Sequence, residues 1–170
     1  MADEAPDAAP ASGGERHLET DTVALFTPIQ NGKVLAAICA VNGIKGKVIE
    51  TSAGAFAVLD DTSDGATDTA GEVISGFVAT EPILALERRA GQLTVQRWQA
   101  GVKQGNLPPG LALDQAPGAI MTLMTGVQTI DELAKTHPDK VFSAEMGRVK
   151  AFRELRKLAK IAKKQAQAGD

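Results

Sequence analysis

Cysteine and histidine are the side chains most often used in nucleophilic catalysis, and the 170-residue chain holds one Cys and two His. Cys39 would act as a nucleophile only with His137 beside it to take the thiol proton. Cys39 lies in the apolar run AAICAV, however, where a cysteine is usually a small buried hydrophobe with a raised pKa. His17 lies in a polar segment near the N-terminus. We therefore predict no catalytic residue, and these three side chains are too few for a structural zinc site.

The acidic segment DDTSDGATDTAG, residues 60–71, imitates the start of a calcium-binding loop. Alternate positions carry oxygen ligands, and a glycine follows for the sharp turn. The twelfth position, which requires a bidentate carboxylate, is Gly71, and Glu72 arrives one residue late. We therefore expect no metal ion and no other cofactor. Residues 61–71 are predicted to form an exposed loop that contributes nothing to the core.

Positive charge is concentrated near the C-terminus. Residues 148–164 carry eight basic side chains and one acid, a net charge of +7, whereas residues 1–24 carry −5. Such asymmetry indicates an anionic partner, although the acidic end could also screen the basic one. We predict that these cations contact the RNA or DNA backbone, with salt-sensitive affinity that is largely independent of sequence. They are Arg148, Lys150, Arg153, Arg156, Lys157, Lys160, Lys163 and Lys164.

A protein partner is the alternative for the same segment. Phe152, Leu155 and Leu158 would then dock on an acidic protein surface, and the charges would set orientation and rate. A solvated helix face without a partner is a further alternative, because the cations are interpreted as not all sharing one side of the helix.

Gly43 and Gly46 in the segment VNGIKGKVI have the spacing of a G-x-x-G signature. The segment resembles the signature of KH domains, in which helix-flanked glycines let the backbone approach nucleic-acid phosphates closely. The resemblance covers about 40 residues. It makes Gly43, Lys45, Gly46 and Lys47 a second candidate nucleic-acid contact, and residues 47–52 are interpreted as a short turn of helix. A plain connecting turn is the alternative.

Residues 129–135, TIDELAK, resemble the first helix of a helix-turn-helix pair. Such a pair places its second helix in the major groove of DNA. The glycine common in the turn is replaced here by Thr136-His137-Pro138. A helical hairpin packed on the sheet is therefore the alternative.

Hydrophobic patterning divides the chain into four sections. Residues 1–20 form a predicted disordered acidic arm, residues 21–100 an α+β domain, residues 101–118 a linker rich in Gly and Pro without regular structure, and residues 119–170 a helical section. In the second section we expect a strand near 23–28, a helix over 32–41, a strand over 55–60 and a hairpin over 83–98 that ends at Trp98. Residues 72–80 fit either a strand or a helix. In the last section we expect helices over 119–125, 129–136 and 139–168, with capping boxes at Thr129/Glu132 and Thr136/Asp139.

Composition narrows the class of protein further. The chain is 44% hydrophobic and has no apolar run of about 18 residues, which predicts a cytoplasmic protein without a membrane span. Neither a G-x-S-x-G elbow nor a Walker phosphate loop occurs. We expect an α+β fold, with a small mixed sheet and short helices, followed by a helical C-terminal section that ends in a long basic helix. The expected function is non-catalytic binding of nucleic-acid backbone. A protein-interaction adaptor or assembly factor is the first alternative and an enzyme of unidentified class the second.

Overall fold

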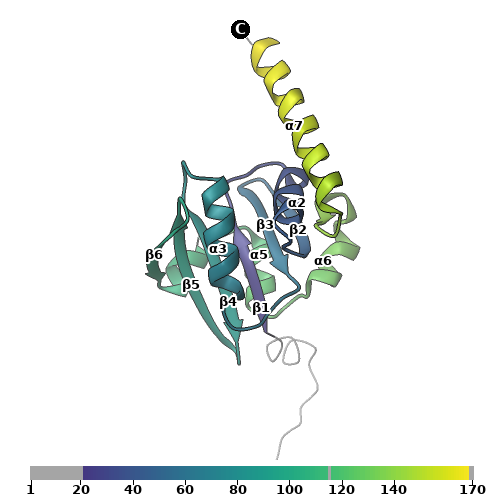
Figure 1. Cartoon of the computed structure of the whole chain (residues 1–170). Coiled ribbons are helices and arrows are strands. Elements are labelled where there is room, and N and C mark those ends of the chain that lie inside the picture. Colours follow the sequence, from purple (N-terminus) through teal and green to yellow (C-terminus); the bar gives the residue numbers. More distant parts are fainter. Residues whose placement is uncertain (1–20, 115, 169–170) are drawn as a thin grey trace, which may run out of the picture.

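The computed structural model describes residues 21–114 and 116–168, and a seven-stranded sheet lies at the centre of this part of the chain (Figure 1). The strand order is β6-β5-β4-β1-β3-β2-β7, and all six pairings are antiparallel. The predicted α+β class is confirmed, with antiparallel rather than mixed pairing. The strands are β1 (Thr22–Phe26), β2 (Gly46–Thr51), β3 (Gly54–Leu59), β4 (Ile83–Arg89), β5 (Gln92–Gln99), β6 (Val102–Leu107) and β7 (Val141–Ser143).

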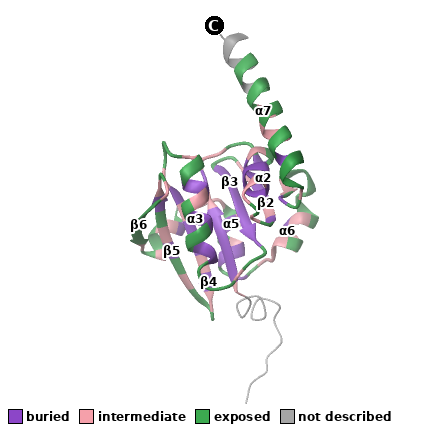
Figure 2. Ribbon diagram, viewed as in Figure 1, coloured by how far each residue is buried: buried purple, intermediate pink, exposed green. Residues whose placement is uncertain are grey.

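Helices cover both faces of the sheet, so the core is divided into two layers (Figure 2). The first layer lies under α2 (Gly32–Val41), α3 (Ala66–Phe77) and the start of α7 (Arg148–Ala168). The second lies under α4 (Pro109–Asp114), α5 (Gly118–Met124) and α6 (Ile130–Thr136), and a short 3-10 helix, η2 (Pro138–Lys140), follows α6.

Strand β3 is apolar along its whole length because both of its faces are covered. In β3, Ala55, Ala57 and Leu59 belong to the first layer of the core. Phe56 and Val58, which point to the opposite face, belong to the second. The predicted strand over 55–60 is confirmed, as are the strand near 23–28 and the helix over 32–41.

The hairpin predicted over 83–98 is also confirmed, as β4 and β5. Its turn residues Ala90 and Gly91 both have positive φ, 50° and 79°, as a two-residue hairpin turn requires. Trp98, at the end of β5, is 6% exposed. Its indole packs against Gly71 of α3, where a Cβ would lie 2.7 Å from the ring.

The prediction of an exposed loop over 61–71 is wrong in its second half, because α3 begins at Ala66. Ala66, Ala70 and Ile74 recur every four residues and are buried, so α3 packs through small side chains that hydrophobicity alone does not mark as core. The undecided segment 72–80 is helical as far as Phe77.

The short helix predicted over 47–52 is wrong: these residues form most of β2. The β-branched pair Val48 and Ile49 point to opposite faces, and each contributes to a different layer of the core. Pairing with β3 on one side and β7 on the other fixes the extended backbone. A KH-like helix after the G-x-x-G segment is therefore absent from the described residues.

Residues 101–118 contain regular structure, although none was predicted there. Residues 102–107 form β6, which pairs with β5 at the edge of the sheet, and Pro109 begins α4. Proline is tolerated in the first turn of a helix. A glycine inside a strand often marks a bulge, and Gly105 lies at the register shift between β5 and β6.

The helices predicted over 119–125 and 129–136 are confirmed as α5 and α6, and the predicted capping box of Thr129 and Glu132 is present. A continuous helix from Asp139 is wrong, because η2 and β7 come first and α7 begins only at Arg148. Val141 and Phe142 pair with the edge of β2, a long-range contact that the local sequence does not encode. The second predicted capping box is also wrong, since the Thr136 hydroxyl donates back to the carbonyls of Glu132 and Leu133.

The predicted acidic arm, residues 1–20, lies outside the described residues. Within the described ranges, no helix combines the length and apolar character needed to cross a bilayer.

Candidate nucleic-acid interface

The first half of α7 is anchored to the body of the protein. Ala151 is fully buried, and Leu155 packs against the first core layer. The helix runs beside α2 and starts near the end of it, because the guanidinium of Arg148 lies over Gly43, directly after α2. With 21 residues α7 is about 31 Å long, whereas α2, with ten residues, is about 15 Å long. The rest of α7 therefore projects beyond the body, as Figure 1 shows.

The cations of α7 share one side of the helix, contrary to the interpretation from the sequence. At 100° per residue, the seven cations from Lys150 to Lys164 fall within an arc of about 140°. The buried residues Ala151 and Leu155 lie on the opposite side. All eight basic side chains, Arg148 included, are exposed, and most of the α7 ribbon has the colour of exposed residues in Figure 2. Charge repulsion and burial of the apolar side together turn this cationic face toward solvent.

No carboxylate neutralises the cationic face within the described part of the chain. The ion pairs found there join other residues, such as Lys103 with Asp68 at 3.1 Å and Lys140 with Glu50 at 3.6 Å. Glu154 is the one acid of α7, and it makes no ion pair with the described residues. Residues 21–114 and 116–168 therefore supply no ion-pair partner to the cationic face.

The three predicted partner-docking residues differ in exposure. Phe152 is 57% exposed and, with Val149, lines a shallow groove along the cationic face. Leu158 is half-buried. Leu155 is half-buried as well and packs against the core of its own molecule, so part of its surface is already used.

The G-x-x-G segment joins α2 to β2, and close packing explains its second glycine. Gly46 is buried, and a Cβ on it would collide with the backbone carbonyl oxygen of Val58 in β3. Gly43 has φ 72° and is exposed, and a Cβ there would lie 2.9 Å from the guanidinium at the end of the long Arg148 side chain. Gly46 therefore serves the approach of two strands rather than the approach of a phosphate.

Substituting the two glycines separates the structural role from a binding role. We expect Gly46→Ala to destabilise the fold by at least about 2 kcal/mol, because backbone atoms must move. Gly43→Ala should cost about 1 kcal/mol, the strain of a left-handed alanine, because the Arg148 side chain can rotate away. Urea unfolding of both variants measures the difference. Equal losses would contradict the assigned role of Gly46.

Lys47 is already engaged within the molecule. Its Nζ lies 2.7 Å from Oδ1 of Asp131, so an ion pair joins β2 to α6. The hydrogen bond between them raises the pKa of Lys47 and lowers the pKa of Asp131. Both side chains are therefore charged at neutral pH, and Lys47 is less available to a phosphate than the cations of α7.

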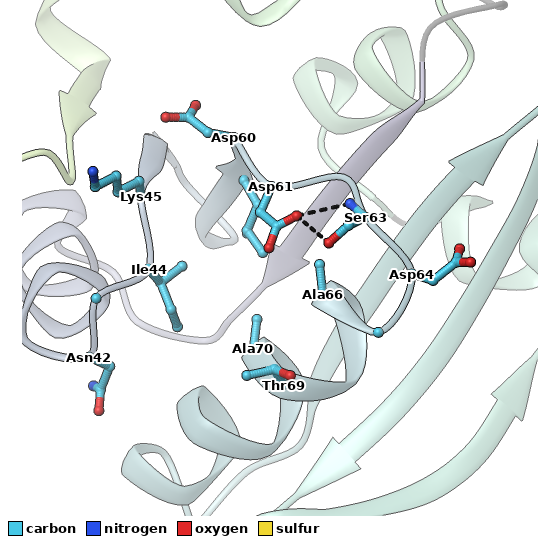
Figure 3. A pocket seen from close by; sticks show the side chains of 13 residues that line it. Asn42, Ile44, Lys45, Asp60, Asp61, Ser63, Asp64, Ala66, Thr69 and Ala70 are labelled. Atoms are coloured by element: carbon cyan, nitrogen blue, oxygen red, sulfur yellow. Dashed lines mark hydrogen bonds between the residues drawn. The ribbon is translucent and has the colours of Figure 1, made fainter.

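Lys45 lines a hollow of about 620 Å³ between the G-x-x-G segment and the start of α3 (Figure 3). The same hollow is lined by Asp60, which lies beside Lys45, and by Asp61 and Asp64. Hydrogen bonds from the hydroxyl and the backbone N–H of Ser63 lower the pKa of Asp61, which keeps it ionised at neutral pH. Negative charge in this hollow repels phosphate, so we leave the G-x-x-G segment out of the proposed interface. No cluster of three or more metal-binding side chains occurs among the described residues.

The structure does not bring Cys39 and His137 together. Cys39 is 1% exposed in the first core layer, under α2, and burial raises the pKa of its thiol to about 12. His137 ends α6, which covers the opposite face of the sheet, and its side chain is exposed. The thiol is therefore protonated at neutral pH and has no base beside it.

The helix-turn-helix resemblance also fails at its second helix. α6 is followed by η2 and β7, and the next long helix starts only at Arg148. Leu133 of α6 belongs to the second core layer. α6 packs on the sheet, as the alternative expected from the sequence requires, but the helical hairpin of that alternative is not formed, because η2 and β7 lie between α6 and α7.

One buried cation was missed from the sequence. Arg88 of β4 is 3% exposed, and its Nη1 donates to the carbonyls of Leu123 and Met124, at 3.0 and 3.3 Å. Its Nη2 donates to the hydroxyl of Thr22 at 3.0 Å. Arg88 therefore caps the C-terminus of α5, whose last turn has no basic residue of its own. The only sequence signal for its burial was the two-residue alternation of β4, which places Arg88 on a covered face of the sheet.

No protein-family model matches the chain, and neither the curated proteins nor the solved structures compared with it gave a match. Its function is therefore inferred from the charges and contacts of α7.

Proposed function

We propose that this protein is a non-catalytic binder of nucleic-acid backbone and that α7 is its interface. The observation that supports the proposal is the exposed arc of seven cations, which form no ion pair with the described residues, on a helix that projects from the body. Each cation that meets a phosphate releases a condensed counterion, and this release drives binding that is largely independent of sequence.

The charge of the rest of the molecule confines the interface to α7. Residues 148–164 carry +7 while the whole chain carries −3, so the other residues together carry −10. A polyanion is repelled by that acidic remainder and attracted to the projecting helix. This polarity orients α7 toward the ligand. It is also compatible with the pI of about 5.4, which is too low for a domain that binds nucleic acid over its whole surface.

A protein-interaction adaptor is the second candidate, and the exposed apolar pair Val149 and Phe152 favours it. Apolar anchors next to cations would fit a partner with an acidic surface around an apolar pocket.

We also propose a cytoplasmic location for the protein. The buried free thiol of Cys39 supports it, since unpaired cysteines suit a reducing compartment.

The test compares two double variants that remove the same charge. Lys157→Gln with Lys160→Gln alters the cationic face, whereas Lys33→Gln with Lys135→Gln removes two exposed lysines elsewhere. Affinity for a labelled 20-nucleotide DNA and a 20-base-pair duplex is measured by fluorescence anisotropy from 50 to 300 mM salt.

If all seven cations contact phosphates, log K should fall with log salt with a slope of about −5 to −6. The α7 variant should flatten this slope by about 1.5, and the control variant should leave it unchanged. Absence of binding at 50 mM salt, or equal flattening in both variants, would contradict the proposal.

A further inference from the structure

Phe152 is an exposed aromatic side chain at the border of a cationic surface. Its ring is 57% exposed, and it lines the same groove as Arg153, Arg156 and Lys160. At 100° per residue, Phe152 lies about 40° from Arg156 around the helix axis, one turn away. An aromatic face and a guanidinium are therefore presented side by side to one ligand.

Phe152 belongs to neither core layer of the described residues. Ala151 and Leu155, on the inner side of the same turns, make the contacts with the body. Phe152 turns outward beside Val149, which is 74% exposed. The exposed ring would gain from burial against a ligand, and the neighbouring cations would gain from an anion.

We propose that the ligand of α7 is single-stranded nucleic acid, with Phe152 stacked on an unpaired base while the neighbouring cations hold the phosphates on either side. This inference rests on the proposed function. Aromatic side chains within a basic groove are the usual means of binding single strands, because every unpaired base offers a π-face. In a duplex these faces are already stacked, so Phe152 would have to open a base step before it made contact.

The position of Phe152 in the helix fits this role. It lies in the half of α7 that Ala151 and Leu155 anchor, so its backbone is held in place. From Phe152 the cationic face continues for about 18 Å, along the anchored half and into the projecting part, as far as Lys164. A strand stacked at Phe152 would therefore follow a track of lysines away from the acidic body.

The test uses a labelled 12-nucleotide oligo-dT and a 12-base-pair duplex as probes. Phe152→Ala should weaken binding of the single strand about 5- to 150-fold, the range for loss of one stacked base. It should change duplex affinity less than twofold and leave the salt slope unchanged. Phe152→Trp, which keeps an aromatic ring at this position, should bind the single strand about as tightly as the unaltered protein does. Phe77→Ala is the matched control, since Phe77 is 53% exposed on α3, away from the cations.

The outcomes separate the two proposals. Equal loss of single-strand and duplex affinity in Phe152→Ala, or no loss of either, would overturn the stacking proposal while charge-driven binding stands. Failure of the unaltered protein to bind either probe at 50 mM salt would overturn the proposed function itself. Displacement of oligo-dT by a poly-glutamate peptide, with the same dependence on Phe152, would overturn both in favour of an acidic protein partner.

Discussion

Reversing four charges on α7, with Lys157, Lys160, Lys163 and Lys164 all changed to Glu, is expected to lower nucleic-acid affinity on the order of 10³-fold at 50 mM salt. Only three cations of the arc would remain, and four new carboxylates would repel the phosphates. The four side chains are exposed, so the body of the protein should fold unchanged. Fluorescence anisotropy with the 20-nucleotide DNA measures the loss.

A neutral version of the same variant controls for helix content. Glutamates near the C-terminus of a helix oppose its dipole, whereas four glutamines at these positions have good helix propensity and no charge. Far-UV circular dichroism should show intact helix in the glutamine variant. Its salt slope should be about 3 units flatter than that of the unaltered protein. Retention of full affinity in the charge-reversed protein would show that α7 is not the interface.

The largest effect on stability is expected from Arg88→Leu. The substitution removes charge-assisted hydrogen bonds to two carbonyls of α5 and to Thr22, and it leaves these buried oxygens without that donor. Each such bond to a charged group contributes about 1.5–3 kcal/mol, offset by the cost of burying the guanidinium, so we expect a net loss of about 3 kcal/mol. Burial lowers the pKa of Arg88, but an arginine remains protonated at neutral pH.

Urea unfolding followed by the fluorescence of Trp98 measures this loss, since Trp98 is the single tryptophan and is buried. Arg97→Leu is the matched control on the next strand, because Arg97 is exposed, and it should change stability by less than about 0.5 kcal/mol. A loss below about 1 kcal/mol in Arg88→Leu would refute the role of Arg88 as the cap of α5.

Local patterns predicted the elements whose burial is visible in their own residues. The apolar run of β3 and the spaced aliphatic residues of α2 were sufficient, because covered strands and amphipathic helices are marked by bulky side chains. The capping box at Thr129 was equally local. By contrast, the start of α3 is built from Ala66, Ala70 and Gly71, whose burial depends on the sheet beneath them.

The elements that were missed depend on contacts distant in the sequence. β7 is three residues long and is extended because the edge of β2 binds it. The same contact keeps residues 141–143 extended, so the helix that the sequence predicted from Asp139 does not start there. Gly46 has a similar explanation: the strand that requires its small size, β3, is formed by residues further along the chain.

The residues of the candidate interface and their placement on one side of α7 were both predictable from the sequence, although the interpretation from the sequence missed the second. A run of cations is visible in any sequence, and the helical period places those of α7 on one side. Their lack of a carboxylate partner within the described residues, and the inward turn of Leu155, depend on how α7 packs against the body. The charge of Lys47 was equally visible in the sequence, yet its pairing with Asp131 is a tertiary contact.

Lysine reactivity in the complex tests the central claim most directly. Acetylation of surface lysines, read by mass spectrometry with and without a 20-nucleotide DNA at 50 mM salt, reports which side chains the ligand covers. The proposal predicts that Lys157, Lys160, Lys163 and Lys164 lose reactivity while Lys33 and Lys135 keep theirs. Unchanged reactivity along α7 in a protein that has bound the DNA would contradict the claim.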